Sequence, residues 1–174
     1  MELIATVELT DSNSSELEFA SIPGTYTDLY LVASTRHNGN DYGLSIKFNG
    51  STANISSLYL NGRGSVADSG SGYFTQVGAS NQETMTTNTF SSNGIYIANY
   101  ASTSPKSFSA EGTTENNATT SLMNITAGLF NSTSPITSIS INGINTTGVS
   151  YLQTYTSASL YGIASGSDGT TTVT

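Results

Sequence analysis

Short hydrophobic runs separated by polar, glycine-rich segments extend along the whole of this 174-residue chain. In residues 43–49, Leu44, Ile46 and Phe48 alternate with polar residues, a period typical of a strand with one buried face. Spacing of the helical kind is absent over any useful length. The pattern predicts an all-β protein with eleven strands, at residues 3–9, 17–20, 28–36, 43–49, 55–60, 73–77, 94–101, 106–111, 121–130, 136–141 and 158–164.

Two further alternating runs predict which side chains are buried. The first is Met123, Ile125, Ala127 and Leu129, and the second is Thr137, Ile139 and Ile141. Both are expected to turn these residues toward the core, as 43–49 does. Residues 29–33 are instead continuously apolar, which predicts a central strand covered on both faces. Residues 61–72 and 81–89 are rich in small polar residues and predict long surface loops.

The strand density is that of a single-domain, jelly-roll-like β-sandwich. We assign residues 1–164 to this domain, because neither an internal repeat nor a linker divides it. Residues 165–174 form a polar C-terminal tail, which we expect to be ordered and docked on a partner, because such a tail frays unless something holds it.

Sheet edges carry a second prediction about partners. Exposed edges are usually protected by lysine or proline, and this chain has four Lys and Arg residues and three prolines in all. The edges are therefore closed, bulged or occupied by neighbouring chains, and we expect a homo-oligomer. Glycine-rich bulges and short strands are the alternative explanation.

The composition then narrows the function. Only 9% of the residues are charged, against about a quarter in ordinary domains, and the chain lacks cysteine and tryptophan. Twelve carboxylates against four basic residues give a net charge of −8, which disfavours nucleic-acid binding. The N-terminal residues 1–5 carry no basic or long apolar stretch, so we expect neither a leader nor a membrane span, and synthesis in the host cytoplasm.

Candidate catalytic and metal-binding groups are sparse. The lone histidine, His37, is followed by Asp41, which could orient it toward a serine, but a histidine in a solvated turn is the simpler interpretation. Glu16 and Glu18 fit the wet face of a strand better than a glycosidase pair, and Glu111 is a further carboxylate candidate. Residues 11–13 and 38–41 are oxygen-rich turns that calcium could use, yet Asx turns explain them. We predict no enzyme activity and no cofactor.

Tyrosine is the residue type that suggests binding. Ten tyrosines offer rigid amphipathic contact area for a partner or a sugar. Tyr96 and Tyr100 are expected to share one strand face, and Tyr151 and Tyr155 lie in a polar stretch before the last strand. We take these four as possible glycan or partner contacts.

Three blocks together resemble a known family: FASIPGTYTDLYLV at 19–32, LSIKFNG at 44–50 and ASLYGI at 158–163. They are similar to blocks in a family of small structural proteins of tailed bacteriophages that are abundant in marine phage genomes. The resemblance runs from about residue 17 to 164 and implies a β-sandwich located in the virion. It points to no active residue.

The main hypothesis is a virion structural protein, namely a capsid decoration or head-fibre protein on the particle surface. Its partners would be copies of itself and other virion proteins, the major capsid protein or tail components. The alternative is a tail-fibre or receptor-binding module for a host-surface glycan, using Tyr151, Tyr155 and the loops at 61–72 and 81–89. A glycan-degrading enzyme is the remote alternative.

Overall fold

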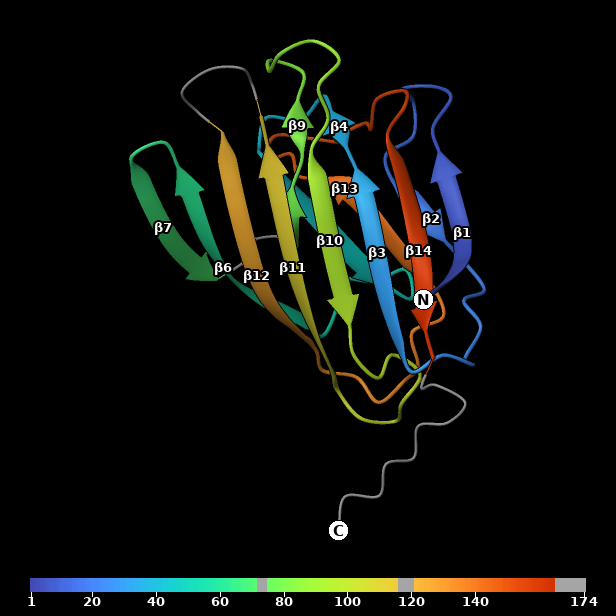
Figure 1. Cartoon of the computed structure of the whole chain (residues 1–174). Helices are drawn as coiled ribbons and strands as arrows, with labels where there is room; N and C mark the ends of the chain where they lie inside the picture. Colours follow the sequence, from blue (N-terminus) through green and yellow to red (C-terminus); the bar gives the residue numbers. More distant parts are fainter. Residues whose placement is uncertain (72–74, 116–120, 165–174) are drawn as a thin grey trace.

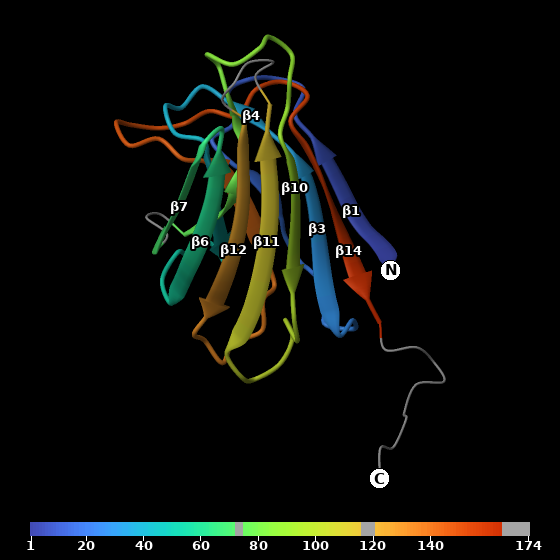
Figure 2. The same cartoon turned by 60° about the vertical axis from the view of Figure 1, so that its left-hand side comes forward.

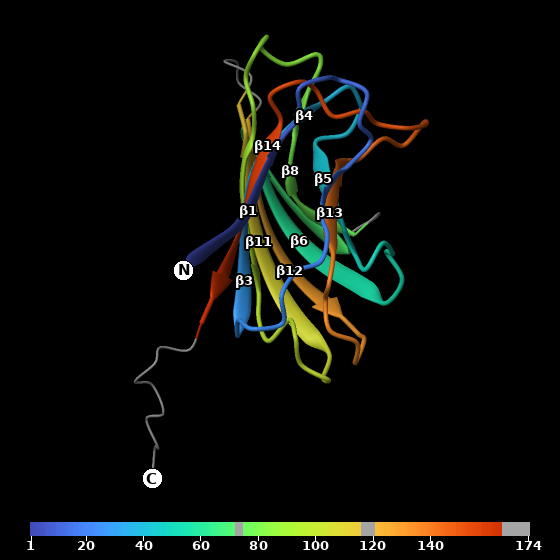
Figure 3. The same ribbon diagram turned by 90° about the vertical axis from the view of Figure 1, so that its right-hand side faces the viewer.

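A computed structural model describes residues 1–71, 75–115 and 121–164 of the chain. These residues form fourteen strands and no helix, arranged as a two-layered β-sandwich (Figures 1 and 3). The strands are β1 (Glu2–Glu8), β2 (Leu17–Phe19), β3 (Asp28–Ser34), β4 (Arg36–His37), β5 (Gly43–Phe48), β6 (Ile55–Arg63), β7 (Val66–Ser71), β8 (Gln76–Ala79), β9 (Asn81–Gln82), β10 (Ser92–Ile97), β11 (Lys106–Thr114), β12 (Leu122–Phe130), β13 (Ile139–Gly143) and β14 (Ser157–Ile163).

The two layers are antiparallel sheets of unequal size. The large sheet has eight strands in the order β1-β14-β3-β10-β11-β12-β6-β7, and the small sheet has four in the order β2-β13-β5-β8. Figure 1 looks onto the outer face of the large sheet, with the small sheet behind it, and Figure 3 shows the two layers edge-on. A short parallel pair, β4 with β9, lies at one end.

Eight of the strands have jelly-roll topology. When β1, β2, β3, β5, β8, β10, β13 and β14 are counted in chain order, they form one sheet in the order 1-8-3-6 and another in the order 2-7-4-5. This strand order in two facing sheets is the double Greek key of a jelly roll. The predicted all-β sandwich is confirmed.

Two strand pairs are added to this jelly roll. β6 and β7 lie between β5 and β8 in the chain, and β11 and β12 lie between β10 and β13. All four add to the same edge of the large sheet, beyond β10, and we call them the four-strand extension (Figure 2). The extension widens the large sheet beyond the four strands that belong to the jelly roll.

The core lies between the layers and is built from alternating strand positions. Leu29 and Leu31 of β3 and Ile95 and Ile97 of β10 are fully buried from the large sheet. Phe48 of the small sheet packs edge-on against Phe108 of β11, with ring centroids 5.5 Å apart. An apolar interior of this kind supplies the main driving force for folding.

Each of the eleven predicted runs contains a strand, although the boundaries shift by a few residues. Three strands, β4, β7 and β9, have no predicted run of their own. Residues 61–72 were predicted as a loop, yet β6 continues through Arg63 and turns back as β7. Gly64 adopts a positive φ of 51° at that turn, so the glycine that suggested a loop makes a hairpin instead. Residues 81–89 begin with β9 and then form the predicted surface segment.

The predicted faces of two strands are wrong. β3 is central, between β14 and β10, but only one face is covered: Leu31 is buried while Val32 is 40% exposed. On β12 the predicted buried residues Met123, Ile125, Ala127 and Leu129 point outward. Their neighbours Asn124 and Thr126 point inward.

A polar ladder explains why β12 takes this orientation. Thr126 Oγ1 donates to Asn124 Oδ1 at 2.8 Å, and Asn124 Nδ2 donates to Asn61 Oδ1 of β6 at 2.7 Å. The three side chains are buried but hydrogen-bonded, which removes most of the cost of placing polar groups inside.

The predicted tail, residues 165–174, lies outside the described residues.

Candidate functional site

An apolar patch covers the outer face of the four-strand extension. Ile125 of β12 pairs with Leu60 of β6, and Ala127 pairs with Leu58, so their side chains stand beside one another. The large members are between 40% and 65% exposed, and we define the outer patch as Leu58, Leu60, Met123, Ile125 and Leu129. A contiguous exposed apolar surface of this kind marks an interaction site more often than an isolated exposed side chain does.

Hollows flank the outer patch on both sides. One, of about 360 Å³, lies across β3, β10, β11 and β12 and has Tyr30, Val32 and Met123 in its lining. The other, of about 430 Å³, lies over β6, β7 and β12 beside Leu58 and Leu129. Projecting apolar side chains next to hollows give this face the relief that interdigitating surfaces need.

Few charges surround the outer patch. Glu111 of β11 is exposed and pairs directly with Ile125, so one carboxylate borders the patch. The neighbouring outward positions of β11 are Ser107, Ser109 and Thr113. The face is therefore mostly neutral on a chain whose net charge is −8.

All four basic side chains are engaged within the molecule. Arg36 is buried and donates to the backbone carbonyls of Glu83, Met85, Thr86 and Thr89, and burial lowers its pKa. These bonds fix the segment that follows β9.

The second buried cation is Lys106, whose Nζ donates to the carbonyls of Ser132 and Ser134 at 3.0 and 2.6 Å. Burial lowers its pKa. The two remaining cations form ion pairs, Lys47 with Glu16 at 2.7 Å and Arg63 with Asp68 at 3.2 Å. Two of the four basic side chains are buried and the other two are ion-paired. The described surface therefore has no cluster of unpaired positive charge that could bind phosphates.

A polar cleft of about 590 Å³ opens on the outer face of the small sheet. Its lining combines apolar contacts from Ile55, Ile144 and Val149 with amides of Asn142 and Asn145 and with one ion pair. The hydroxyls that line it belong to Ser15, Ser45, Thr52, Thr75 and Ser150.

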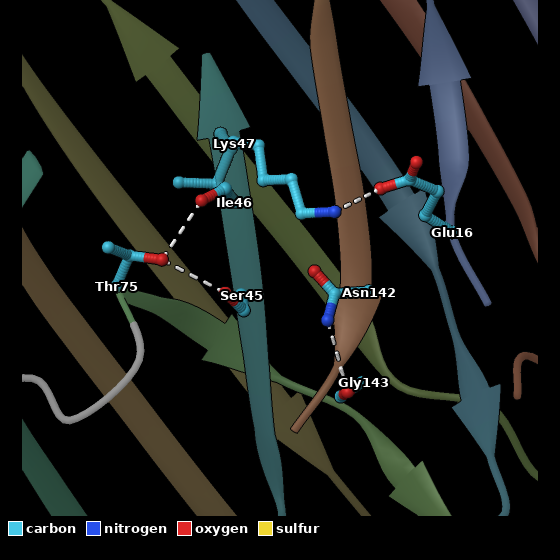
Figure 4. Close-up of polar contacts among 7 residues, drawn as sticks. All are labelled: Glu16, Ser45, Ile46, Lys47, Thr75, Asn142 and Gly143. Atoms are coloured by element: carbon cyan, nitrogen blue, oxygen red, sulfur yellow. Dashed lines mark hydrogen bonds and ion pairs between the residues drawn. The ribbon is translucent and has the colours of Figure 1, made fainter. Parts of the chain in front are cut away.

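The ion pair crosses the cleft wall above β13. Lys47 reaches from β5 over β13 to Glu16, which precedes β2 (Figure 4). On the other side of β13, Ser45 Oγ and Thr75 Oγ1 lie 2.9 Å apart, and Thr75 also donates to the carbonyl of Ile46. Glu16, Thr75 and the β5 pair Ser45 and Lys47 come from three separate stretches of the sequence, and the fold brings them together.

Asn142 lies beside this ion pair on the same face (Figure 4). Its Nδ2 makes a long bond of 3.4 Å to the carbonyl of Gly143. Its Oδ1 is shielded from solvent and has no hydrogen-bond partner among the described residues. Buried acceptors are usually paired, so this unpaired oxygen is an exception.

His37 lies under one end of the cleft and is fully buried rather than in a solvated turn. Gly39 N–H donates to its Nδ1 at 3.1 Å, so this nitrogen accepts, and the Ser150 hydroxyl donates to it as well, at 2.7 Å. Burial lowers the pKa of His37 to about 4, against the opposing effect of Asp41. The predicted exposed turn is wrong because the ring fills space left by Gly143, which a Cβ would close.

The candidate carboxylates do not converge. Glu16 lies at the cleft of the small sheet, whereas Glu111 lies on the outer face of the large sheet. Asp41 Oδ1 accepts from Gly43 N–H at 2.8 Å, and Asp11 Oδ1 accepts from Asn13 N–H at 3.0 Å, as expected of Asx turns. Within the described ranges, no group of three or more His, Asp or Glu side chains is placed to hold a metal ion.

The four candidate tyrosines are dispersed. Tyr96 is on the outer face of the large sheet, where its hydroxyl donates to Asp28 at 2.7 Å and its pKa is raised by that bond. Tyr151 and Tyr155 are exposed in the segment before β14.

Tyr100 is a correction, because it is fully buried and donates to the carbonyl of Pro23. β10 ends at Ile97, and Asn99 takes a positive φ of 49°, so the chain turns before Tyr100 and breaks the alternation that linked it to Tyr96. Tyr100 is therefore unavailable as a surface contact.

Comparison with known proteins finds no family model, curated protein or solved structure that matches this chain. Among the residues that the structure describes, no helix is long and apolar enough to span a membrane.

Sequence reasoning missed both surfaces. Alternation along β12 identified the right set of apolar residues but gave the wrong face for them. The cleft residues gave no local signal, because Glu16, Lys47 and Asn142 are separated by long stretches of chain and meet only through β-sheet register.

Proposed function

We propose that this chain is a non-enzymatic structural protein of a tailed-phage particle, assembling with copies of itself as a decoration or head-fibre protein on the particle surface. The observation that carries the proposal is the outer patch on the four-strand extension. The resemblance of residues 19–32, 44–50 and 158–163 to phage structural proteins supports the location.

The position of the outer patch supports a role in assembly. The jelly roll is complete without the extension, and on the inner side of the extension Asn61, Asn124 and Thr126 are linked by hydrogen bonds. Leu58, Leu60 and Ile125 are between 53% and 65% exposed, so more than half of each residue's surface stays in contact with water, and this exposure carries a solvation cost. A surface that covers them recovers this free energy.

A second copy of the chain is the occupant that fits best. Copies carrying −8 each repel, so they approach most easily through a face that is nearly free of charge. In a two-fold contact the same patch serves both partners, and the Leu58 and Met123 side chains of each can enter the hollows of the other.

Mass measurement in solution tests the assembly step. We expect the full chain to be an oligomer in analytical ultracentrifugation and the double variant Leu58→Ser/Ile125→Ser to be monomeric. Val149→Ser is the matched control, because Val149 is as exposed as Leu58 but lies at the cleft of the small sheet. A wild-type chain that stays monomeric at high concentration contradicts the assembly step, and so does a double variant that still assembles.

Cryo-electron microscopy of the particle that carries this chain tests the location. The proposal expects copies of the sandwich on the head shell. Density confined to the tail, or no density in the virion, overturns it. The receptor-binding alternative is favoured by a separate observation, the polar cleft.

A further inference from the structure

We infer that the polar cleft on the small sheet is a binding site for a neutral saccharide unit. This inference does not rest on the proposed assembly, because the cleft and the outer patch lie on opposite faces of the sandwich. It also assigns binding to residues other than the four candidate tyrosines.

The recognition groups are arranged for hydroxyls. The Glu16–Lys47 pair uses one carboxylate oxygen and one ammonium proton on each other, since Oε2 and Nζ are 2.7 Å apart. The two side chains are each about one-third exposed and both line the cleft, so the second carboxylate oxygen and the other ammonium protons are available to a ligand. A sugar hydroxyl both donates and accepts, and two neighbouring hydroxyls match such an acceptor beside a donor.

Asn142 extends this array. Its Oδ1 has no partner among the described residues, and its Nδ2 is held by one long bond only. Rotation of the amide, which is held only by that long bond, would turn Oδ1 toward a ligand hydroxyl that supplies the missing donor. A buried acceptor left without a partner is destabilising, so its pairing favours the bound state.

Charge selects the class of ligand. The carboxylate and the ammonium cancel, so an anion is repelled by Glu16 and a cation by Lys47 at the same point of the wall. The apolar side chains of Ile55, Ile144 and Val149 complete the lining and suit the C–H faces of a pyranose ring. A volume of about 590 Å³ is in the range of small-ligand pockets and accommodates one or two sugar rings.

The experiment titrates the isotope-labelled full chain by two-dimensional amide NMR. The neutral probes are the methyl glycosides of glucose, galactose, mannose and N-acetylglucosamine. The charged probes are N-acetylneuraminic acid and glucosamine. We expect at least one neutral glycoside to give saturable shifts centred on Ser45, Asn142 and Gly143, and both charged sugars to bind more weakly.

Three variants make the result specific. Lys47→Met keeps the aliphatic stem but removes the ammonium, and Asn142→Ala removes the amide, so each should weaken binding by about tenfold or more. Arg63→Met breaks the other surface ion pair, on β6 and β7, and should leave the affinity unchanged. The amide spectra themselves report whether each variant is folded.

Several outcomes overturn the site. These are no saturable shift with any neutral glycoside, shifts centred on Tyr96, Tyr151 or Tyr155, tighter binding of a charged sugar, or wild-type affinity in both cleft variants. Leu58→Ser/Ile125→Ser should bind the glycoside normally, so loss of assembly and loss of sugar binding are separable results.

Discussion

The guanidinium of Arg36 and the ammonium of Lys106 are spent on backbone carbonyls rather than on solvent or on carboxylates. Because the chain has four basic residues, burying two of them removes half of these positive charges from the surface, but their hydrogen bonds stabilise the fold. Charge-assisted hydrogen bonds of this kind stabilise by about 1.5–3 kcal/mol each, so two side chains fix two irregular segments that have little apolar burial of their own.

His37 makes stability depend on pH. Its pKa is about 4 in the folded protein because of burial, against about 6.5 in the unfolded chain, so between these values the unfolded state binds more protons. The free energy of unfolding should therefore rise from pH 4 to pH 6.5, by up to about 3 kcal/mol from this residue, and level off above. Urea unfolding across this range measures the slope.

A variant separates the contribution of His37 to the pH dependence of stability from the contributions of other titratable groups. His37→Asn keeps an acceptor for Gly39 N–H and Ser150 but removes the titration. The difference in unfolding free energy between wild type and variant should change with pH only within this window. Parallel profiles would show that His37 does not carry the dependence.

At the scale of elements, alternation predicted strands well because the pleat repeats every two residues. It predicted the apolar face of β5 correctly, since Leu44, Ile46 and Phe48 are buried, although Ser45 on the opposite face is buried as well. It could not choose the buried face of β12, where one face is apolar and the other holds Asn124 and Thr126. That choice depends on Asn61, a residue 63 positions away on β6, which satisfies the inward amide.

The cleft could not be predicted from the sequence for a related reason. Lys47 and Asn142 face the same side only because β5 and β13 pair with Ser45 opposite Asn142 and Lys47 opposite Ser140. Register between distant strands cannot be read from local pattern. The jelly roll was predictable from strand density, whereas β7 of the four-strand extension was not, because residues 61–72 resemble a loop in composition.

Gly128 determines how β12 packs on β11. The ring of Phe108 lies over it, and a Cβ at this position would overlap the ring. Gly128→Ala should therefore destabilise the protein by about 1–3 kcal/mol, the usual cost of overpacking. Gly62→Ala is the control in the same extension, because nothing lies within 4 Å of its Cβ position, and it should stay within about 0.5 kcal/mol of wild type. Thermal unfolding of the two variants tests the contact, and equal effects would refute it.

At the scale of the whole molecule, the two faces of the sandwich differ in chemistry. The large sheet has an apolar outer patch with little charge, and the small sheet has a polar cleft with a balanced ion pair. A particle-surface protein that docks through one face leaves the other face toward the medium. The proposed assembly and the proposed saccharide site are therefore compatible in a single particle.

Glu111 provides the last test of the assembled state. It is exposed and pairs with Ile125, so in a two-fold contact through the outer patch the carboxylates of both copies lie near the interface. Their repulsion is screened over about 8 Å at physiological ionic strength, which predicts that added salt strengthens association.

Glu111→Gln should tighten the assembly by about threefold at low salt and reduce this salt dependence. Glu18→Gln removes the same charge from the small sheet, remote from the patch, and should change the affinity less. Sedimentation at two ionic strengths compares the two variants. Equal effects would mean that only net charge matters, and weaker association of Glu111→Gln would place the interface elsewhere.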